Sequence, residues 1–181
     1  MAISEQALRQ ALATMVPDEL GTDVITAGCL RSLVVTDAGV QLEIRLGYPC
    51  ASRLSAYREQ IEALLAPVLA GLPLHLHLDW QVQPHRNQQN LPALDQVSNI
   101  VAVSSGKGGV GKSTTAVNLA LALQAEGARV GVLDADVFGP SLPLMLGVPD
   151  GLRPKVKDGK LFIPIEAHGL QSMSMGYLVD E

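Results

Sequence analysis

The sequence is poor in aromatic residues, in cysteine and in basic charge, and each shortage excludes a class of protein. Phe, Trp and Tyr make up 3% of its 181 residues, so aliphatic side chains must fill the core. Cys29 and Cys50 are the only cysteines, too few for a disulfide scaffold, and they favour a reduced, cytoplasmic setting. The formal net charge of −5 argues against nucleic acid as the main partner.

Long apolar runs are missing as well. No run approaches the roughly 18 residues that a membrane helix needs, and the first residues lack the basic-then-apolar order of a signal peptide. We therefore expect no membrane partner. Hydrophobic residues still make up 48% of the chain, enough for the cores of one large or two small domains.

Residues 1–82 predict a small α+β domain with helices on one face of a sheet. Ser4 is a candidate N-cap for an amphipathic helix that ends before Pro17. A second helix is predicted over about 51–66, because Pro67 should end or bend it. Alternating apolar residues predict three strands, the first two joined as a hairpin. These strands cover residues 30–36, 40–46 and 72–80.

Residues 83–97 predict a linker, since they are too polar and proline-rich to bury much surface. Residues 98–181 predict the first part of a P-loop domain with a doubly wound parallel sheet. A βαβ unit would begin it, because an apolar strand, a helical stretch ending before Gly127 and a second strand follow one another. These elements are expected over residues 99–104, 111–126 and 128–133.

The stretch from Gly106 to Ser113 fits the phosphate-binding pattern G-x-x-x-x-G-K-[ST]. Its glycines can take positive φ and curl tightly, so that backbone N–H groups face inward as an anion-binding nest. The helix that follows would add its positive N-terminal end. In this pattern Lys112 reaches the β- and γ-phosphates, and the Ser113 hydroxyl binds Mg²⁺.

Asp134-Ala135-Asp136 directly follows the second predicted strand of this domain. Ligands of open α/β sheets bind beyond the C-terminal strand ends, so these carboxylates should face the same crevice as the loop. One could bind Mg²⁺ through water while the other orients the attacking water. Alternatively, the acidic pair only caps a strand and starts a turn, helped by Gly139-Pro140, and both interpretations stay open.

Lys107 adds an early lysine to the loop, which reads Gly-Lys-Gly-Gly-Val-Gly-Lys-Ser. This resembles the deviant Walker A loop of the ATPase class that includes the nitrogenase iron protein and the positioning and partition ATPases. In that class the early lysine reaches the nucleotide of the opposing subunit, so the resemblance implies a nucleotide-sandwich homodimer.

More narrowly, several segments resemble the Mrp/ApbC-type iron–sulfur cluster carriers, and the N-terminal domain is similar to the iron–sulfur assembly domain of bacterial members. The resemblance implies an ATP-hydrolysing carrier that passes clusters, of the 4Fe–4S type, from an assembly scaffold to apo-proteins. The alternative is a positioning or partition-type ATPase that acts as a dimer switch. The resembling segments are 104–113, 134–141, 145–147, 153–154, 158–160, 168–170 and 174–176.

The same resemblance assigns roles to single residues. Lys107, acting in trans, and Lys112 would be catalytic, together with Asp136 as the residue that positions water. Asp134 would lie near the Mg²⁺ that Ser113 binds. The nucleotide-binding residues that it implies are Gly106, Lys107, Gly108, Gly109, Val110, Gly111, Lys112, Ser113 and Thr114.

The resembling family continues further, with a Walker B aspartate and a cluster-binding C-x-x-C that this sequence lacks. Asp180 ends an apolar run, but the family has its Gly-Tyr-Leu there, ahead of Walker B. We therefore expect a C-terminally truncated fragment without the iron–sulfur cysteines. A third possibility is that only the first domain folds, as a protein-binding module.

Two further groups invite a functional interpretation. Cys50 lies at the start of the second predicted helix, where a thiol pKa is lowered. The resembling domain often has a cysteine near this position, although a packed small residue explains it more simply. His75, His77 and Asp79 share one strand face, and a solvated polar face explains them more simply than a metal does.

Overall fold

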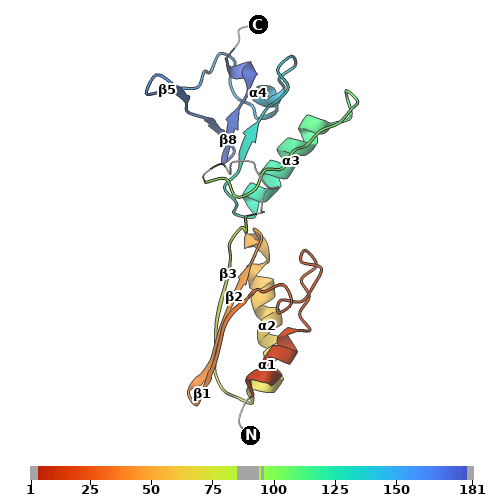
Figure 1. Ribbon diagram of the computed structural model, residues 1–181, viewed down its shortest axis with the longest axis vertical. Coiled ribbons are helices and arrows are strands. Elements are labelled where there is room, and N and C mark those ends of the chain that lie inside the picture. The colour runs from red at the N-terminus through yellow and green to blue at the C-terminus, as the bar shows by residue number, and fades with distance from the viewer. Residues whose placement is uncertain (1–3, 85–93, 95, 179–181) are drawn as a thin grey trace. The chain divides into compact units, whose positions relative to one another are not determined.

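The structure is a computed structural model that describes residues 4–84, 94 and 96–178 (Figure 1). The chain divides into two compact units, residues 1–93 and 94–181, and each is described by itself. Most of the predicted linker, 85–93 and 95, lies outside the described residues. Among the described residues, no helix combines the length and apolarity that a membrane span requires.

Both described helices of the first unit begin near the predicted positions; the first ends before Pro17, as predicted, whereas the second continues beyond Pro67. In α1 (Glu5–Leu12), the Ser4 hydroxyl accepts a hydrogen bond from the Ala7 N–H at 3.3 Å, as expected of an N-cap. The helix ends before Pro17 because the chain tightens after Leu12, where the Met15 N–H donates to the Leu12 carbonyl. A 3₁₀ turn, η1 (Ala51–Arg53), leads into α2 (Leu54–Leu69).

Pro67 does not end α2. The helix continues for two residues beyond it and stops where Ala70 takes a left-handed conformation with φ 48°. A proline in the last turn removes one hydrogen bond only, a smaller loss than in a helix interior.

The sheet of the first unit has the strand order β1-β2-β3. β1 (Leu30–Thr36) and β2 (Gly39–Leu46) form the predicted antiparallel hairpin. β3 (Leu74–Trp80) pairs with β2 in parallel, from Val40 opposite Leu74 to Leu46 opposite Trp80. α2 makes the crossover between these two strands, as parallel neighbours require.

Both helices lie on one face of this sheet, as predicted (Figure 1). Alternate residues of β2 point into the core between the sheet and the helices, while those between them face outward. The core is almost entirely aliphatic, as the shortage of aromatic residues requires. Its largest fully buried side chains are Leu8, Leu12, Val24, Val40, Leu42, Ile44, Leu46, Cys50, Ile61 and Leu65.

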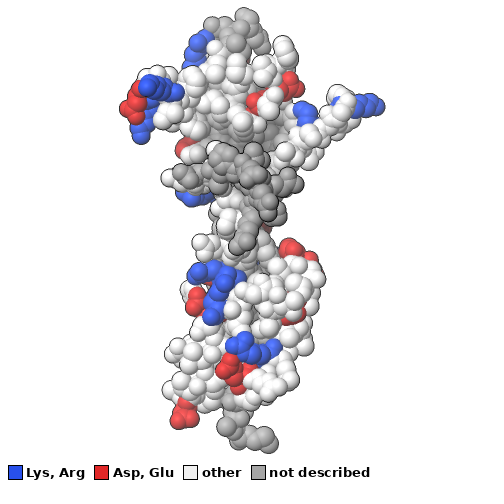
Figure 2. Space-filling model, viewed as in Figure 1, with Lys and Arg blue, Asp and Glu red and all other residues white. Residues whose placement is uncertain are grey.

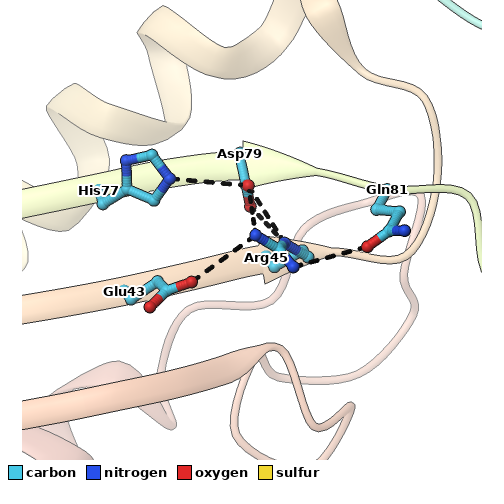
Figure 3. Close-up of polar contacts among 5 residues, drawn as sticks. All are labelled: Glu43, Arg45, His77, Asp79 and Gln81. Atoms are coloured by element: carbon cyan, nitrogen blue, oxygen red, sulfur yellow. Dashed lines mark hydrogen bonds and ion pairs between the residues drawn. The ribbon is translucent and has the colours of Figure 1, made fainter.

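The outer face of the sheet carries a polar cluster around Arg45 (Figure 3). The Arg45 Nε donates to both carboxylate oxygens of Asp79 at 2.9 and 3.1 Å, and its Nη2 donates to Oδ2 at 2.8 Å. The hydrogen bond from Arg45 is the main cause that lowers the pKa of Asp79. His77 lies 3.6 Å from the same carboxylate. Within the described ranges, no group of His, Cys, Asp and Glu side chains is arranged to hold a metal ion.

In the second unit, a small sheet and two helices enclose a separate core. α3 (Lys112–Ala125) and α4 (Leu142–Met145) are its helices, and η2 (Met175–Tyr177) is a 3₁₀ turn. The sheet has the order β4-β8-β7, with β4 parallel to β8 and β8 antiparallel to β7. These strands are β4 (Gly131–Leu133), β7 (Ile165–Ala167) and β8 (Leu170–Met173), and a hairpin of β5 (Val156–Lys157) and β6 (Leu161–Phe162) stands apart.

The predicted strand over residues 99–104 does not form. Ile100 and Val101 are 69% and 65% exposed, and none of the described strands pairs with this segment. An apolar run becomes a strand only where a neighbouring strand binds its backbone N–H and C=O groups. The second predicted strand is shortened to β4, so neither the βαβ unit nor a doubly wound sheet is present in the part of the chain described.

The paired Arg45 and Asp79 should stabilise the first unit at neutral pH and not in acid. The pKa of Asp79 is lowered in the folded protein. Its contribution to folding stability is therefore fully present above the unfolded pKa of about 3.9, and it is lost as the pH falls through the lower, folded pKa. A double-mutant cycle with Arg45→Met and Asp79→Asn should give a favourable coupling at pH 7, larger than that of an exposed helix pair, and a much smaller one at pH 2.5. Trp80, the only tryptophan, reports urea unfolding of this unit alone.

The exposed pair Glu5 and Arg9 on α1 supplies the control. Its coupling should be about 0.3 kcal/mol, as for other surface pairs of this spacing. Equal couplings for the two pairs would contradict the role given to Arg45.

A candidate phosphate-binding site

The glycine-rich loop forms an exposed turn between residue 104 and the start of α3 (Figure 1). Gly109 and Gly111 have positive φ, 72° and 87°, whereas Gly106 and Gly108 do not. The Ser105 hydroxyl accepts from the Lys107 N–H at 3.2 Å, which fixes the entry to the turn. Only two of the four glycines therefore need the conformational freedom that glycine provides.

α3 begins at Lys112, with Gly111 as its N-cap, and no side chain caps its first N–H groups. Its first turn holds no acidic residue. The first N–H groups of a helix have no partner within it, and together with the helix dipole they favour an anion. At the other end the Gly127 N–H donates to the Gln124 carbonyl with φ 93°, so Gly127 closes the helix as predicted.

A cavity of about 480 Å³ lies beside the start of α3. Lys112 and Ser113 line it from the helix, and Asp134 and Asp136 line it from the segment after β4. The structure thus brings together the phosphate loop and the acidic pair, which the sequence predicted to share a crevice. In Figure 1 the loop before α3 and the segment between β4 and α4 lie at the same end of this unit.

The other predicted nucleotide-binding residues do not line this cavity. Lys107 and Val110 project from the exposed part of the loop, and Thr114 is exposed on α3. An added Cβ at any of the loop glycines would meet nothing within 4 Å, so the loop has open space around it. Figure 2 shows both Lys or Arg and Asp or Glu side chains on the surface of this unit. The surface of the first unit also carries charges of both signs.

The acidic pair organises the turn that follows β4. The Asp134 Oδ1 accepts from the Asp136 N–H at 3.1 Å, and the Asp136 Oδ1 accepts from the Gly139 N–H at 3.1 Å. The Asp134 Oδ2 accepts from the N–H groups of Ser141 and Leu142, both at 3.2 Å. The turn-forming interpretation of this pair is therefore correct, and it coexists with a position on the cavity wall.

Sequence reasoning missed Ser174 as a partner of Asp134. Its hydroxyl donates to the Asp134 Oδ2 at 3.2 Å from forty positions away. The Asp134 N–H also donates to the Met173 carbonyl at 2.9 Å, where β8 runs beside β4. Ser174-Met175-Gly176 carried part of the family resemblance, but no local pattern indicates which distant carboxylate its hydroxyl contacts.

Cys50 is a packed residue in this structure. Its side chain is 2% exposed, at the start of η1, and it makes no side-chain cap there. Cys29 is also buried, and burial raises the pKa of its thiol. The simpler of the two sequence interpretations of Cys50 is thus the one that the structure favours.

Family comparisons agree with this division of the chain. Residues 96–181 match the family model described as NUBPL iron-transfer P-loop NTPase. Residues 5–71 match the one described as iron-sulfur cluster assembly protein. The unit that contains the phosphate loop is therefore part of a P-loop NTPase of the iron-transfer class.

Curated relatives within this class are named iron-sulfur cluster carrier protein. The chain is 42% identical over 170 residues to the iron-sulfur cluster carrier protein of Salmonella typhimurium, covering 94% of this chain and 46% of that protein. It is 41% identical over 184 residues to that of Escherichia coli, covering 99% and 50%. It is 62% identical over 106 residues to that of Pseudomonas fragi, covering 59% and 37%.

The chain belongs to the Mrp/ApbC-type family of iron–sulfur cluster carrier P-loop NTPases. It spans about half the length of the Salmonella and Escherichia relatives.

The two kinds of glycine in the loop should respond differently to alanine. Gly111→Ala forces a side chain into a left-handed conformation, which costs about 1 kcal/mol. Gly108→Ala should be tolerated, because its φ is not positive and its added Cβ meets open space. Amide hydrogen exchange over α3 measures the difference, and equal protection in both variants would contradict the assignment.

Proposed function

We propose that the protein is an ATP-hydrolysing carrier that receives an iron–sulfur cluster and passes it to apo-proteins. The observation that carries the proposal is the cavity that joins Lys112 and Ser113 to the acidic pair, in a chain whose other unit matches an assembly-protein family. The relatives named iron-sulfur cluster carrier protein support the same function.

In this proposal the phosphates of ATP lie over the first turn of α3. The uncapped N–H groups of that turn and the Lys112 ammonium would bind the β- and γ-phosphate oxygens. Thr114 would contact the α-phosphate. Lys107, which projects from the exposed side of the loop, would reach the nucleotide of a second copy in a homodimer.

Mg²⁺ fits the donors that face the cavity. It prefers oxygen ligands, and Ser113 and Asp134, which both line the cavity, offer a hydroxyl and a carboxylate. Once bound, the ion would neutralise charge on the transferring phosphoryl group. Ser113 would bind it directly, and Asp134 would hold one of its waters.

Asp136 would orient the attacking water. Its Oδ1 is held by the Gly139 N–H, so its position depends on the turn over residues 134–142. Loss of the γ-phosphate would alter the contacts of this turn, as it does in other nucleotide switches. ATP turnover would thereby be coupled to the conformation of the dimer.

The remaining parts of the proposal concern the longer protein. A doubly wound sheet would place neighbours beside residues 99–104, whose apolar side chains are exposed here. A cluster of the 4Fe–4S type would be held by cysteines outside this chain, and an assembly scaffold would deliver it. The small number of cysteines suits a reduced, cytoplasmic setting.

Lys112→Ala should weaken ATP binding at least tenfold, because a charge-assisted contact to phosphate is lost. Titration of a fluorescent ATP analogue into the complete polypeptide measures this. Lys160→Ala is the matched control, since Lys160 lies in the exposed β5–β6 turn away from the cavity and should leave the affinity unchanged. Unchanged ATP binding in Lys112→Ala would overturn the nucleotide site.

Cluster transfer tests the rest of the function. The complete polypeptide, reconstituted without oxygen, should take up iron and sulfide and should activate an apo-aconitase-type acceptor. If it instead co-sediments with liposomes or DNA only in the presence of ATP, and carries no cluster, the positioning or partition alternative is correct.

A further inference from the structure

Ser174 is one of two buried polar residues on or beside β8, and its hydroxyl points to the acidic wall of the cavity. It is 1% exposed, and it accepts from the Gly176 N–H at 3.1 Å while it donates to the Asp134 Oδ2. The single hydroxyl proton is therefore committed to Asp134. Ser174 itself does not line the cavity.

The two oxygens of Asp134 are used unequally. Oδ2 accepts from three donors, the N–H groups of Ser141 and Leu142 and the Ser174 hydroxyl. Oδ1 accepts from the Asp136 N–H alone. A carboxylate oxygen offers about two lone pairs, so Oδ2 is fully occupied and Oδ1 retains room for one more donor.

The donors come from three parts of this unit: the turn after β4, the start of α4 and the end of β8. Three of the four donors are N–H groups of the turn and of the start of α4. Ser174 is the donor whose side chain joins the carboxylate to the end of β8, where the Asp134 N–H also donates to the Met173 carbonyl.

We propose that Ser174 is a positioning residue that holds Asp134 with Oδ2 turned to the protein and Oδ1 left for a Mg²⁺-bound water. Ser174 acts through Asp134 and touches neither metal nor nucleotide. The inference rests on the proposed nucleotide site, and it assigns a residue outside the phosphate loop to the magnesium dependence of that site.

Ser174→Ala should separate magnesium dependence from nucleotide binding. We expect the Mg²⁺ concentration for half-maximal ATP-analogue binding to rise about tenfold, the equivalent of one charge-assisted hydrogen bond. Binding of the analogue in EDTA should stay as in the unaltered protein. In the absence of any ligand, amide exchange at Ser141 and Leu142 should become about tenfold faster, because their acceptor loses its anchor.

Ser172→Ala is the matched control. Ser172 is also 1% exposed on β8, but its hydroxyl contacts the Ile165 carbonyl and Tyr177 instead of Asp134. It should lower stability without changing magnesium dependence or exchange at residues 141–142. Ser174→Thr keeps the hydroxyl, so its magnesium dependence and its amide exchange at residues 141–142 should match those of the unaltered protein. If Ser174→Ala does not fold, Ser174→Cys replaces it, because a thiol of similar size is a much weaker donor.

The outcomes separate the two proposals. If the unaltered protein binds no ATP analogue, the proposed function is wrong. If it binds, and Ser174→Ala matches Ser172→Ala in magnesium dependence and in exchange at residues 141–142, Ser174 only fills space and the inference fails. Altered exchange with unchanged magnesium dependence would likewise overturn it, because the turn would then move without consequence for the metal.

Discussion

The carboxylate of Asp134 is the point on which the second unit's site depends. It accepts from the backbone of two turns and from one side chain beside the sheet. A charged acceptor in this position fixes the acidic part of the lining of the cavity that Lys112 and Ser113 also line, before any ligand enters. Both roles considered for the acidic pair, structural and functional, can belong to the same side chain because its two oxygens have different partners.

The same constraint, that backbone and polar groups need partners, explains where sheet forms and where it does not. β2 is stable because it has a strand on each side and a buried face. Residues 99–104 are as apolar as β2, yet they remain without a pairing strand among the described residues. Apolar character selects a segment for burial, but only a neighbour makes it a strand.

The similarity to the carrier proteins extends over both units of the chain. An assembly-type unit and a unit with a phosphate loop occur together in this chain as in the carrier proteins that it matches. Residues 85–93 between them lie outside the described residues, and each unit has a hydrophobic core of its own. In the proposed function the phosphate loop would supply positive charge, and the acidic turn would supply oxygens for a nucleotide-bound cation.

By itself the sequence determined what depends on neighbours along the chain. The Ser4 cap, the hairpin, the alternation in β2, Gly127 and the phosphate loop all follow from local spacing and chemistry, and the structure contains each of them. Only the tertiary structure decided the parallel pairing of β3 with β2, the absence of a strand at 99–104, and the bond from Ser174 to Asp134. These depend on segments far apart in the chain, whose meeting is fixed by packing and backbone pairing that no local pattern encodes.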